Sequence, residues 1–219
     1  MLVSLVVVGS MLACRRQPDA VGSAPVRSAL LEPDAPVWKQ RAPDVYHVRV
    51  ETTRGPFTLE VVRELAPIGA DHFYNLVRAG YYDDSRFSRS IAGWIVQFGI
   101  AGDPRVGATW ASRPIADDPV RAHNDRGTFA YAMRGPDDRT TQIFISRRDN
   151  REQDPQGFAP LGRVVQGMDV VDSLYSGYGE NSGGGVRAGK QGPLVNGGNA
   201  YVDREYPRLD RLVRASVQP

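Results

Sequence analysis

Short runs in which apolar and polar residues alternate recur along this chain, and they constrain its fold more than any other feature. The runs lie at residues 45–52, 57–61, 87–91, 95–99, 127–133, 141–146 and 161–165. A period of two residues is typical of strands that bury one face. The first two runs predict a hairpin, because Arg54 and Gly55 between them suit a turn. Many short strands with only two or three helices favour a mainly β fold, a closed antiparallel barrel, over a layered α/β fold.

Helical spacing is confined to a few segments. Pro67 can occupy a first helical turn, apolar residues follow it at helical spacing, and Gly80 suits the position just past the end. A second short helix is predicted over residues 168–175, and a C-terminal helix and strand over residues 203–214.

Two stretches predict loops. Residues 102–126 are polar and rich in proline, so we expect a loop or an edge region there and no core element. Residues 178–198 are rich in glycine and predict a mobile surface loop.

The overall composition fits one globular domain with some additional sequence. The chain has 219 residues, of which 41% are hydrophobic and 24% are charged, and ordinary domains have about 100–200 residues. The formal net charge is only +2, and basic and acidic residues are interspersed, whereas binding to a phosphate backbone needs a basic stripe. We therefore expect no nucleic-acid partner.

Metal and thiol chemistry are not indicated. Cys14 is the only cysteine, so neither a disulfide nor a cluster of thiolate ligands can form within the chain. His47, His72 and His123 lie far apart, without the spacing of metal ligands. We expect no metal and no cofactor.

The first 43 residues predict an export signal and a tether. Residues 2–13 form an uncharged apolar run, shorter than the about 20 residues of a membrane-spanning helix but suited to a signal peptide. The run ends Met-Leu-Ala-Cys, which resembles a bacterial lipoprotein processing site where Cys14 is lipidated and anchors the chain to a membrane. The alternative is a signal peptide with an unmodified Cys14. Residues 15–43, rich in Pro, Ala, Asp and Ser, predict a flexible linker. We therefore expect a signal peptide (1–14), a linker (15–43) and a folded domain (44–219) in the cell envelope.

One stretch, residues 87–99, combines apolar and polar residues in a way that suits a site. We expect two short strands joined near residues 92–93, with Phe87 and Arg89 on one face of the first and Ile95 and Gln97 on one face of the second. An apolar surface would then carry one guanidinium and one amide. The alternative is a half-buried sheet whose polar residues face solvent.

A later strand presents the same pairing of an amide with an aromatic ring. Gln142 and Phe144 alternate with Ile143 and Ile145, and the two isoleucines can fill the interior. An apolar patch with polar groups beside it then remains on the outer face, as a binding site requires.

Three motifs in order resemble the cyclophilin-type peptidylprolyl isomerases. They are Phe-x-Arg-x-Ile-x-Gly-Trp-Ile-x-Gln at residues 87–97, the segment 132–136, and Thr-Gln-x-Phe-Ile-Ser at residues 141–146. The run Leu-Gly-Arg-Val-Val-x-Gly-Met-Asp-Val-Val at residues 161–171 fits as well, and the resemblance covers about residues 45–174. It implies a closed eight-stranded antiparallel barrel capped by two helices, a site on its outer surface, a monomer, and proline-containing polypeptides as substrates.

The resemblance also implies roles for particular residues. Arg89 matches the catalytic arginine of the family, and Gln97 matches the glutamine that binds the substrate backbone. The matches to the substrate-binding residues are Trp94, Ile95 and Phe144 in the proline pocket, with Ala132 and Gln142 beside it. Met133 and Phe158 stand where better-known members have asparagine and histidine, and no tryptophan between residues 151 and 157 matches their pocket tryptophan. These features predict an isomerase that assists the folding of exported proteins; the alternative is a proline-binding module or holdase with weak catalysis.

Overall fold

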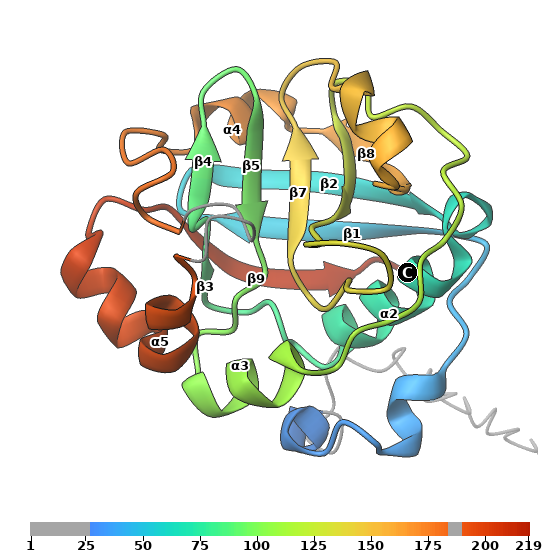
Figure 1. The fold of residues 1–219 in the computed structure, drawn as a ribbon, viewed down its shortest axis with the longest axis horizontal. Coiled ribbons are helices and arrows are strands. Elements are labelled where there is room, and N and C mark those ends of the chain that lie inside the picture. The colour runs from blue at the N-terminus through green and yellow to red at the C-terminus, as the bar shows by residue number, and fades with distance from the viewer. Residues whose placement is uncertain (1–26, 184–189) are drawn as a thin grey trace, which may run out of the picture.

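The strands form one antiparallel sheet that curls back on itself. The computed structural model describes residues 27–183 and 190–219. The strands are β1 (Val45–Thr52), β2 (Gly55–Val62), β3 (Ser85–Arg86), β4 (Arg89–Ile91), β5 (Ile95–Phe98), β6 (Thr128–Tyr131), β7 (Ile143–Ser146), β8 (Pro160–Gln166) and β9 (Arg211–Val217). Their order is β3-β9-β1-β2-β8-β6-β7-β5-β4. In Figure 1, β4, β5 and β7 cross in front of β1, β2 and β9.

The mainly β, antiparallel architecture is confirmed, whereas the predicted strand number and closure differ. The sheet has nine strands among the described residues, and its two ends are β3 and β4. These strands follow each other in the chain, with only Phe87 and Ser88 between them. The sheet therefore closes through a covalent connection, and no ladder joins β3 to β4 within the described residues.

Alternating strands fill the interior. In β1 the side chains of Tyr46, Val48 and Val50 are buried, while their neighbours face outward. The predicted hairpin is confirmed, since Thr52 of β1 pairs with Gly55 of β2. Aromatic rings occupy much of the core, which includes Phe57, Phe73, Tyr82, Phe87, Phe98, Phe129 and Tyr131.

Within the described residues, four α-helices surround the sheet: α2 (Pro67–Arg78), α3 (Pro104–Ala111), α4 (Met168–Ser173) and α5 (Gly192–Glu205). The predictions of α2 and α4 are confirmed, and Gly80 follows α2 with a φ of 71° that glycine adopts without strain. Figure 1 shows α4 above β1 and β2 and α2 below them. Phe73 of α2 and Val171 of α4 belong to the core.

The prediction of a loop without a core element at residues 102–126 is wrong for α3. Asp103 caps this helix by accepting a hydrogen bond from the Arg105 backbone N–H at 2.9 Å, and Pro104 stands in its first turn. Val106 and Trp110, one helical turn apart, are buried. The apolar signal has only two positions, too few to stand out in a proline-rich sequence.

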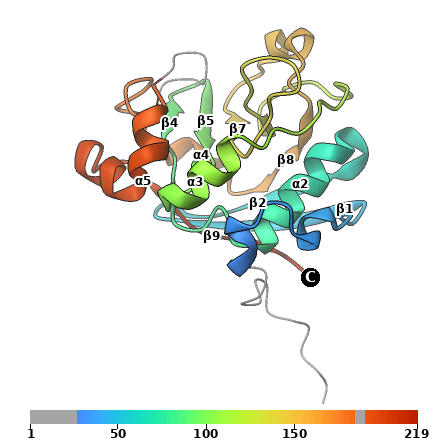
Figure 2. The same ribbon diagram turned by 60° about the horizontal axis from the view of Figure 1, so that its bottom comes forward.

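The prediction of a surface loop at residues 178–198 is wrong for residues 192–198, which belong to α5. Leu194 and Val202 of α5 pack with Ile100 in a small apolar cluster. The helix is interrupted at Gly198, where φ is 54°, and this break explains its weak sequence pattern. Figure 2 shows α5 beside α3. Residues 184–189 of the predicted loop lie outside the described residues.

The described part of the predicted linker packs on the domain. Two 3-10 helices, η1 (Ala29–Leu31) and η2 (Pro36–Lys39), lie within it. The rings of Trp38 and Trp110 are 4.6 Å apart, and the Trp110 indole N–H donates to the Leu30 carbonyl oxygen at 2.9 Å. The prediction of a flexible linker is therefore wrong for residues 27–43. Residues 15–26, the predicted signal peptide and Cys14 lie outside the described residues. In the part of the chain that the structure describes, no helix has the length and apolar character needed to span a membrane.

Candidate active site

Four neighbouring strands align the central residues of the site in one row. Arg89 of β4 pairs with Gln97 of β5, which pairs with Phe144 of β7, which pairs with Ala130 of β6. Residues directly opposite each other in an antiparallel sheet present their side chains on the same face. The row therefore carries a cation, an amide and an aromatic ring side by side.

The two faces of these strands serve different clusters. Ile143 and Ile145 of β7 lie in the main core, whereas Phe144 lies in a second apolar cluster with Ile95, Ala130 and Ala132. Trp94 and Phe158 pack against this second cluster, and the Phe144 and Phe158 rings meet edge to face at 5.5 Å. The predicted alternation of Gln142 and Phe144 against the isoleucines is confirmed.

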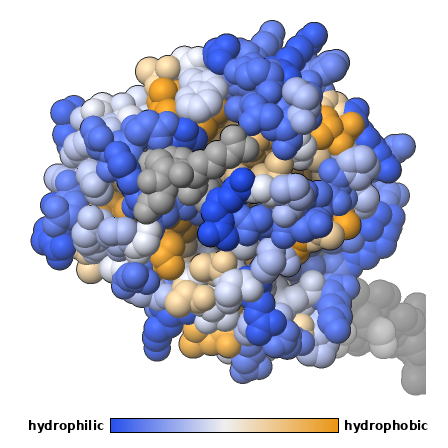
Figure 3. Space-filling view, in the orientation of Figure 1, coloured by the Kyte–Doolittle hydropathy of each residue, from blue (hydrophilic) through white to orange (hydrophobic). Residues whose placement is uncertain are grey.

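The second cluster is the floor of a pocket of about 180 Å³. Its lining contains Arg89, Trp94, Ile95, Gln97, Ala132, Met133, Phe144 and Phe158. On the face shown in Figure 3, which carries β4, β5 and β7, hydrophobic areas are small and lie between hydrophilic residues. A small apolar hollow edged by a guanidinium and an amide suits a compact apolar group next to a polar backbone.

A chain of side-chain amides links the arginine to α5. Arg89 donates from Nη1 to Oε1 of Gln97 at 3.3 Å, and Gln97 donates from Nε2 to Oε1 of Gln142 at 2.8 Å. Gln142 in turn donates to Oε1 of Gln191 at 2.6 Å. These bonds fix the direction of each amide, so that the Gln97 carbonyl group faces Arg89.

Arg89 is held on further sides. Its Nε and Nη2 donate to the two carboxylate oxygens of Glu180 at 2.8 and 2.5 Å. Its guanidinium carbon lies 4.9 Å from the centroid of the Trp94 ring, a distance at which a cation is attracted to the ring face. Although Arg89 is only 9% exposed, each of its three nitrogens donates to one of these partners, and its side chain lines the pocket.

A second hollow lies beside the first and shares Ala132 with it. Gln142, Gln191 and Tyr81 are among the residues that line it. Burial raises the pKa of Tyr81 to about 12, so the phenol stays protonated at neutral pH. It donates to Oγ1 of Thr141 at 3.0 Å, on the residue before Gln142, and thereby ties the start of this strand to the core.

The structure brings together the residues selected from the sequence. Of the nine, Gln142 lies at the edge between the two hollows, and the other eight line the 180 Å³ pocket. The predicted shared face of Phe87 and Arg89 is wrong: Phe87 belongs to the main core, with its ring 5.5 Å from that of Phe98. The period of two breaks here because residues 87 and 88 lie between β3 and β4.

Sequence reasoning missed several residues around the pocket. Glu152, Gln153 and Gln156 line it from the 3-10 helix η4 (Arg151–Gln156), in the segment where no matching tryptophan was found. Glu180 and Gln191 come from the glycine-rich segment. The length of η4 gives no periodic signal, and nothing in the sequence relates Glu180 to an arginine 91 positions earlier.

The three histidines do not form a site. His47 pairs with Glu60 at 3.5 Å, His72 bonds to the Thr140 carbonyl oxygen, and His123 pairs with Asp154. Within residues 27–183 and 190–219, no group of three or more His, Cys, Asp or Glu side chains could hold a metal ion.

The family model described as cyclophilin type peptidyl-prolyl cis-trans isomerase matches residues 47–191. The chain belongs to this family. This cyclophilin is 34% identical over 146 residues to peptidyl-prolyl cis-trans isomerase A of Dickeya dadantii, covering 63% of this chain and 75% of the relative. It is 32% identical over 133 residues to a peptidyl-prolyl cis-trans isomerase of Acinetobacter baylyi, and the match covers 58% of this chain and 70% of the relative.

Solved structures support the fold of this cyclophilin. A Cryptosporidium parvum cyclophilin type isomerase, determined in the presence of the dipeptide Ala-Pro, has a TM-score of 0.58 and 18% identity and covers 79% of this chain and 99% of its own. The cyclophilin AquaCyp293 from Hirschia baltica has a TM-score of 0.57 and 18% identity, and the match covers 80% of this chain and 75% of that protein. The activity of this cyclophilin is peptidyl-prolyl cis-trans isomerisation, in agreement with its relatives.

Proposed function

We propose that this isomerase uses Arg89 as its catalytic donor and Gln97 as its backbone anchor, and that it acts on exported proteins in the cell envelope. The observation that carries the proposal is the row in which Arg89, Gln97 and Phe144 lie opposite one another above an apolar pocket. The related Cryptosporidium structure obtained with Ala-Pro supports proline-containing substrates.

The chemistry that the enzyme must accelerate is a bond rotation. The peptide bond resists rotation by about 18–20 kcal/mol because the nitrogen lone pair is delocalised into the carbonyl group. Before proline, the cis and trans forms differ by only about 0.5–1 kcal/mol, yet they exchange over tens to hundreds of seconds. The enzyme therefore has to lower a barrier and has no equilibrium to shift.

Arg89 suits the stabilisation of the twisted transition state. In that state the lone pair is localised on the prolyl nitrogen, so a fixed donor aimed at this nitrogen binds the transition state better than either planar form. A guanidinium stays charged and directional, whereas an ammonium group reorients readily. Arg89 is held by Gln97 and by the Trp94 ring, which limits its movement at the pocket.

The apolar cluster suits the prolyl ring. Phe144, Ile95 and Trp94 form a surface that can hold the ring while the preceding carbonyl group rotates, and Gln97 can bond to the backbone beside it. A ten-thousandfold acceleration requires about 5–6 kcal/mol from these contacts together. Met133 and Phe158 add apolar surface to the pocket and leave Arg89 and Gln97 in place.

A protease-coupled isomerisation assay on a prolyl tetrapeptide tests these roles. We expect Arg89→Ala to lower kcat/KM by about 10²–10³-fold, the loss typical of one transition-state donor. Arg163→Ala is the matched control, because Arg163 is an arginine of β8 whose side chain is 70% exposed and which lies 3.8 Å from Glu60. An Arg89→Ala enzyme as fast as wild type would contradict the proposed role, and a wild-type protein that binds the peptide without accelerating its isomerisation would support a binding module instead.

The proposed location rests on the N-terminal sequence. The apolar run at residues 2–13 and the Met-Leu-Ala-Cys sequence support export and lipidation of Cys14. Intact mass spectrometry of protein extracted from membranes should give a mass above that of the Cys14–Pro219 polypeptide. Cys14→Ser should lose both the added mass and membrane association, and an unmodified wild-type mass would contradict the anchor.

A further inference from the structure

A carboxylate outside the sequence motifs holds the guanidinium of Arg89. Glu180 accepts hydrogen bonds from Nε and Nη2 of Arg89 through separate oxygens. Such a two-pronged pair fixes both the position and the plane of a guanidinium, which a single bond leaves free to turn. The Arg89 side chain is 11% exposed and that of Glu180 is 45% exposed, so the pair lies at the border of the pocket with solvent.

The segment that carries Glu180 is itself attached to β4. Gly179 forms a β-bridge with Ser90, one residue from Arg89 in the chain. On the other side of Glu180, Ser182 donates from Oγ to the Ser88 carbonyl oxygen at 2.7 Å. A contact therefore flanks Glu180 on each side and secures its backbone along the strand of the arginine.

Two further contacts tie the ends of this segment to the domain. The buried Arg147 donates from Nη1 to Oγ of Ser176 at 2.8 Å. Tyr206 donates from its hydroxyl group to the Asn181 carbonyl oxygen at 2.8 Å. The segment is thus fixed from both ends, unlike a lid that hangs from flexible hinges.

We infer that Glu180 is a positioning residue, which holds the guanidinium of Arg89 in the orientation that the rotating X–Pro bond requires. The inference rests on the proposed role of Arg89. An arginine side chain loses rotamer entropy when it is ordered, and a donor that is oriented before the reaction has no such freedom to lose in the transition state.

The geometry favours positioning over obstruction by Glu180. Contacts within the described residues engage Nε, one N–H of Nη2 and one N–H of Nη1. A guanidinium has five N–H groups, so two remain for a substrate. A blocking carboxylate would also need a segment able to move away, and the contacts on both sides of Glu180 oppose such movement.

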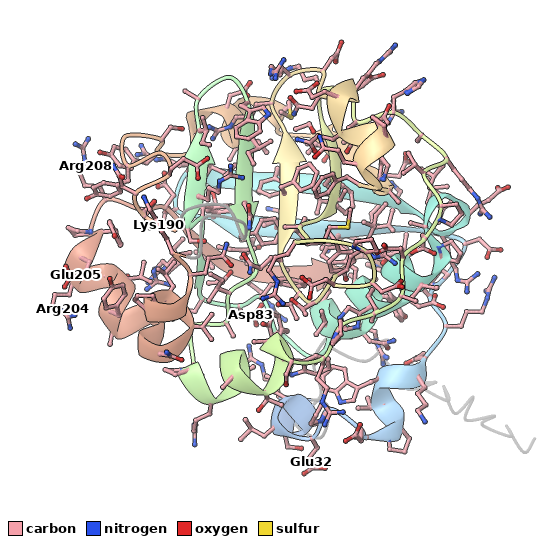
Figure 4. All side chains as sticks on the ribbon, in the orientation of Figure 1. Glu32, Asp83, Lys190, Arg204, Glu205 and Arg208 are labelled. Atoms are coloured by element: carbon pink, nitrogen blue, oxygen red, sulfur yellow. The ribbon has the colours of Figure 1, made fainter. Side chains whose placement is uncertain are left out.

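The test compares two carboxylates of similar exposure. Glu180→Gln keeps the shape of the side chain and one acceptor oxygen but removes the charge and the second acceptor. Glu205→Gln is the matched control: its side chain is 44% exposed and pairs with Arg204 at 2.7 Å. Figure 4 labels Glu205 and Arg204 together at the outer side of α5, away from β4 and β5.

We expect Glu180→Gln to lower kcat about tenfold with KM within about twofold of wild type, since a misplacement of about 1 Å can cost about 100-fold and one bond is retained. Glu205→Gln should match wild type. In an Arg89→Ala background, measured at raised enzyme concentration, Glu180→Gln should cause no further loss, because a positioning residue acts only through the group that it positions.

The outcomes separate this inference from the proposed function. A Glu180→Gln enzyme with wild-type kcat, or with a raised kcat/KM, would overturn the positioning role while a slow Arg89→Ala enzyme still supported the role of Arg89. An equal loss in both backgrounds would show an effect on the fold and would overturn it too. A fully active Arg89→Ala enzyme would refute both.

Discussion

Acidification should destabilise this protein through His72, a residue outside the site. His72 lies on α2 and is partly buried, and its Nε2–H donates to the Thr140 carbonyl oxygen at 2.8 Å. Burial is the main cause that lowers the pKa of His72 from 6.5 to about 4. The nearby Arg139 guanidinium also lowers this pKa, whereas the hydrogen bond to Thr140 raises it. Between about pH 4 and pH 6.5, the His72 ring is therefore mostly neutral in the folded protein and mostly protonated in the unfolded chain.

The sign and size follow from linkage. The unfolded state binds the proton more readily, so the free energy of unfolding falls as the pH drops below about 6.5 and stops falling below about 4. With these two values of the pKa, the loss between pH 7 and pH 5 is about 1.8 kcal/mol, and the full loss is about 3.4 kcal/mol. Both losses are upper limits, because solvent reaches the partly buried ring and reduces the shift of its pKa. Aspartates with a lowered pKa, such as Asp71 and Asp203, also stabilise the folded state, but this stabilisation is lost only at a lower pH, where their carboxylates become protonated.

Urea denaturation at pH 7, 6 and 5 measures the effect. For a slope of about 2 kcal/mol per molar urea, the midpoint of wild type should fall by about 0.9 M between pH 7 and pH 5. His72→Gln keeps a donor near the position of Nε2 and does not titrate, so its midpoint should change much less. His47→Gln, at a histidine whose side chain is 45% exposed, should behave as wild type does. An equal acid loss in wild type and His72→Gln would refute the reasoning.

Two further predictions concern stability. Asp118 is 4% exposed and accepts hydrogen bonds from two backbone N–H groups at the start of α2 and from the buried Arg139. Asp118→Ala should therefore lower the free energy of unfolding by about 3–5 kcal/mol. Asp34→Ala, which removes an exposed pair with Arg113, should have little effect in the same urea titration. A Cβ at Gly162 would lie 1.9 Å from the Glu60 carbonyl oxygen, so Gly162→Ala must separate β2 from β8 and should cost about 1–3 kcal/mol. A melting temperature equal to that of wild type would contradict this close approach.

The sequence predicts the parts of this fold whose patterns are local. The hairpin of β1 and β2 and the helix α2 combine clear periodicity with turn or capping residues. The alternation around Phe144 correctly separates the core face of β7 from the pocket face. These features depend on neighbours in the chain, which a sequence displays directly.

The parts that were missed depend on distant contacts or on broken periods. Phe87 turns inward because the ladder is interrupted beside it. The helix α5 is interrupted at Gly198, and α3 has only two buried apolar side chains in addition to a glycine. The partnership of Glu180 with Arg89 joins residues 91 positions apart. Only the assembled sheet brings such groups together.

The attachment of residues 176–182 to β4 has a consequence beyond the orientation of one arginine. β4 is the last strand of the sheet, and the outer edge of an end strand offers unpaired N–H and C=O groups to any extended polypeptide. An enzyme that acts on X–Pro bonds of polypeptides can meet such segments. The bridge from Gly179 to Ser90 and the bond from Ser182 to Ser88 occupy this edge, so an incoming chain cannot extend the sheet at β4.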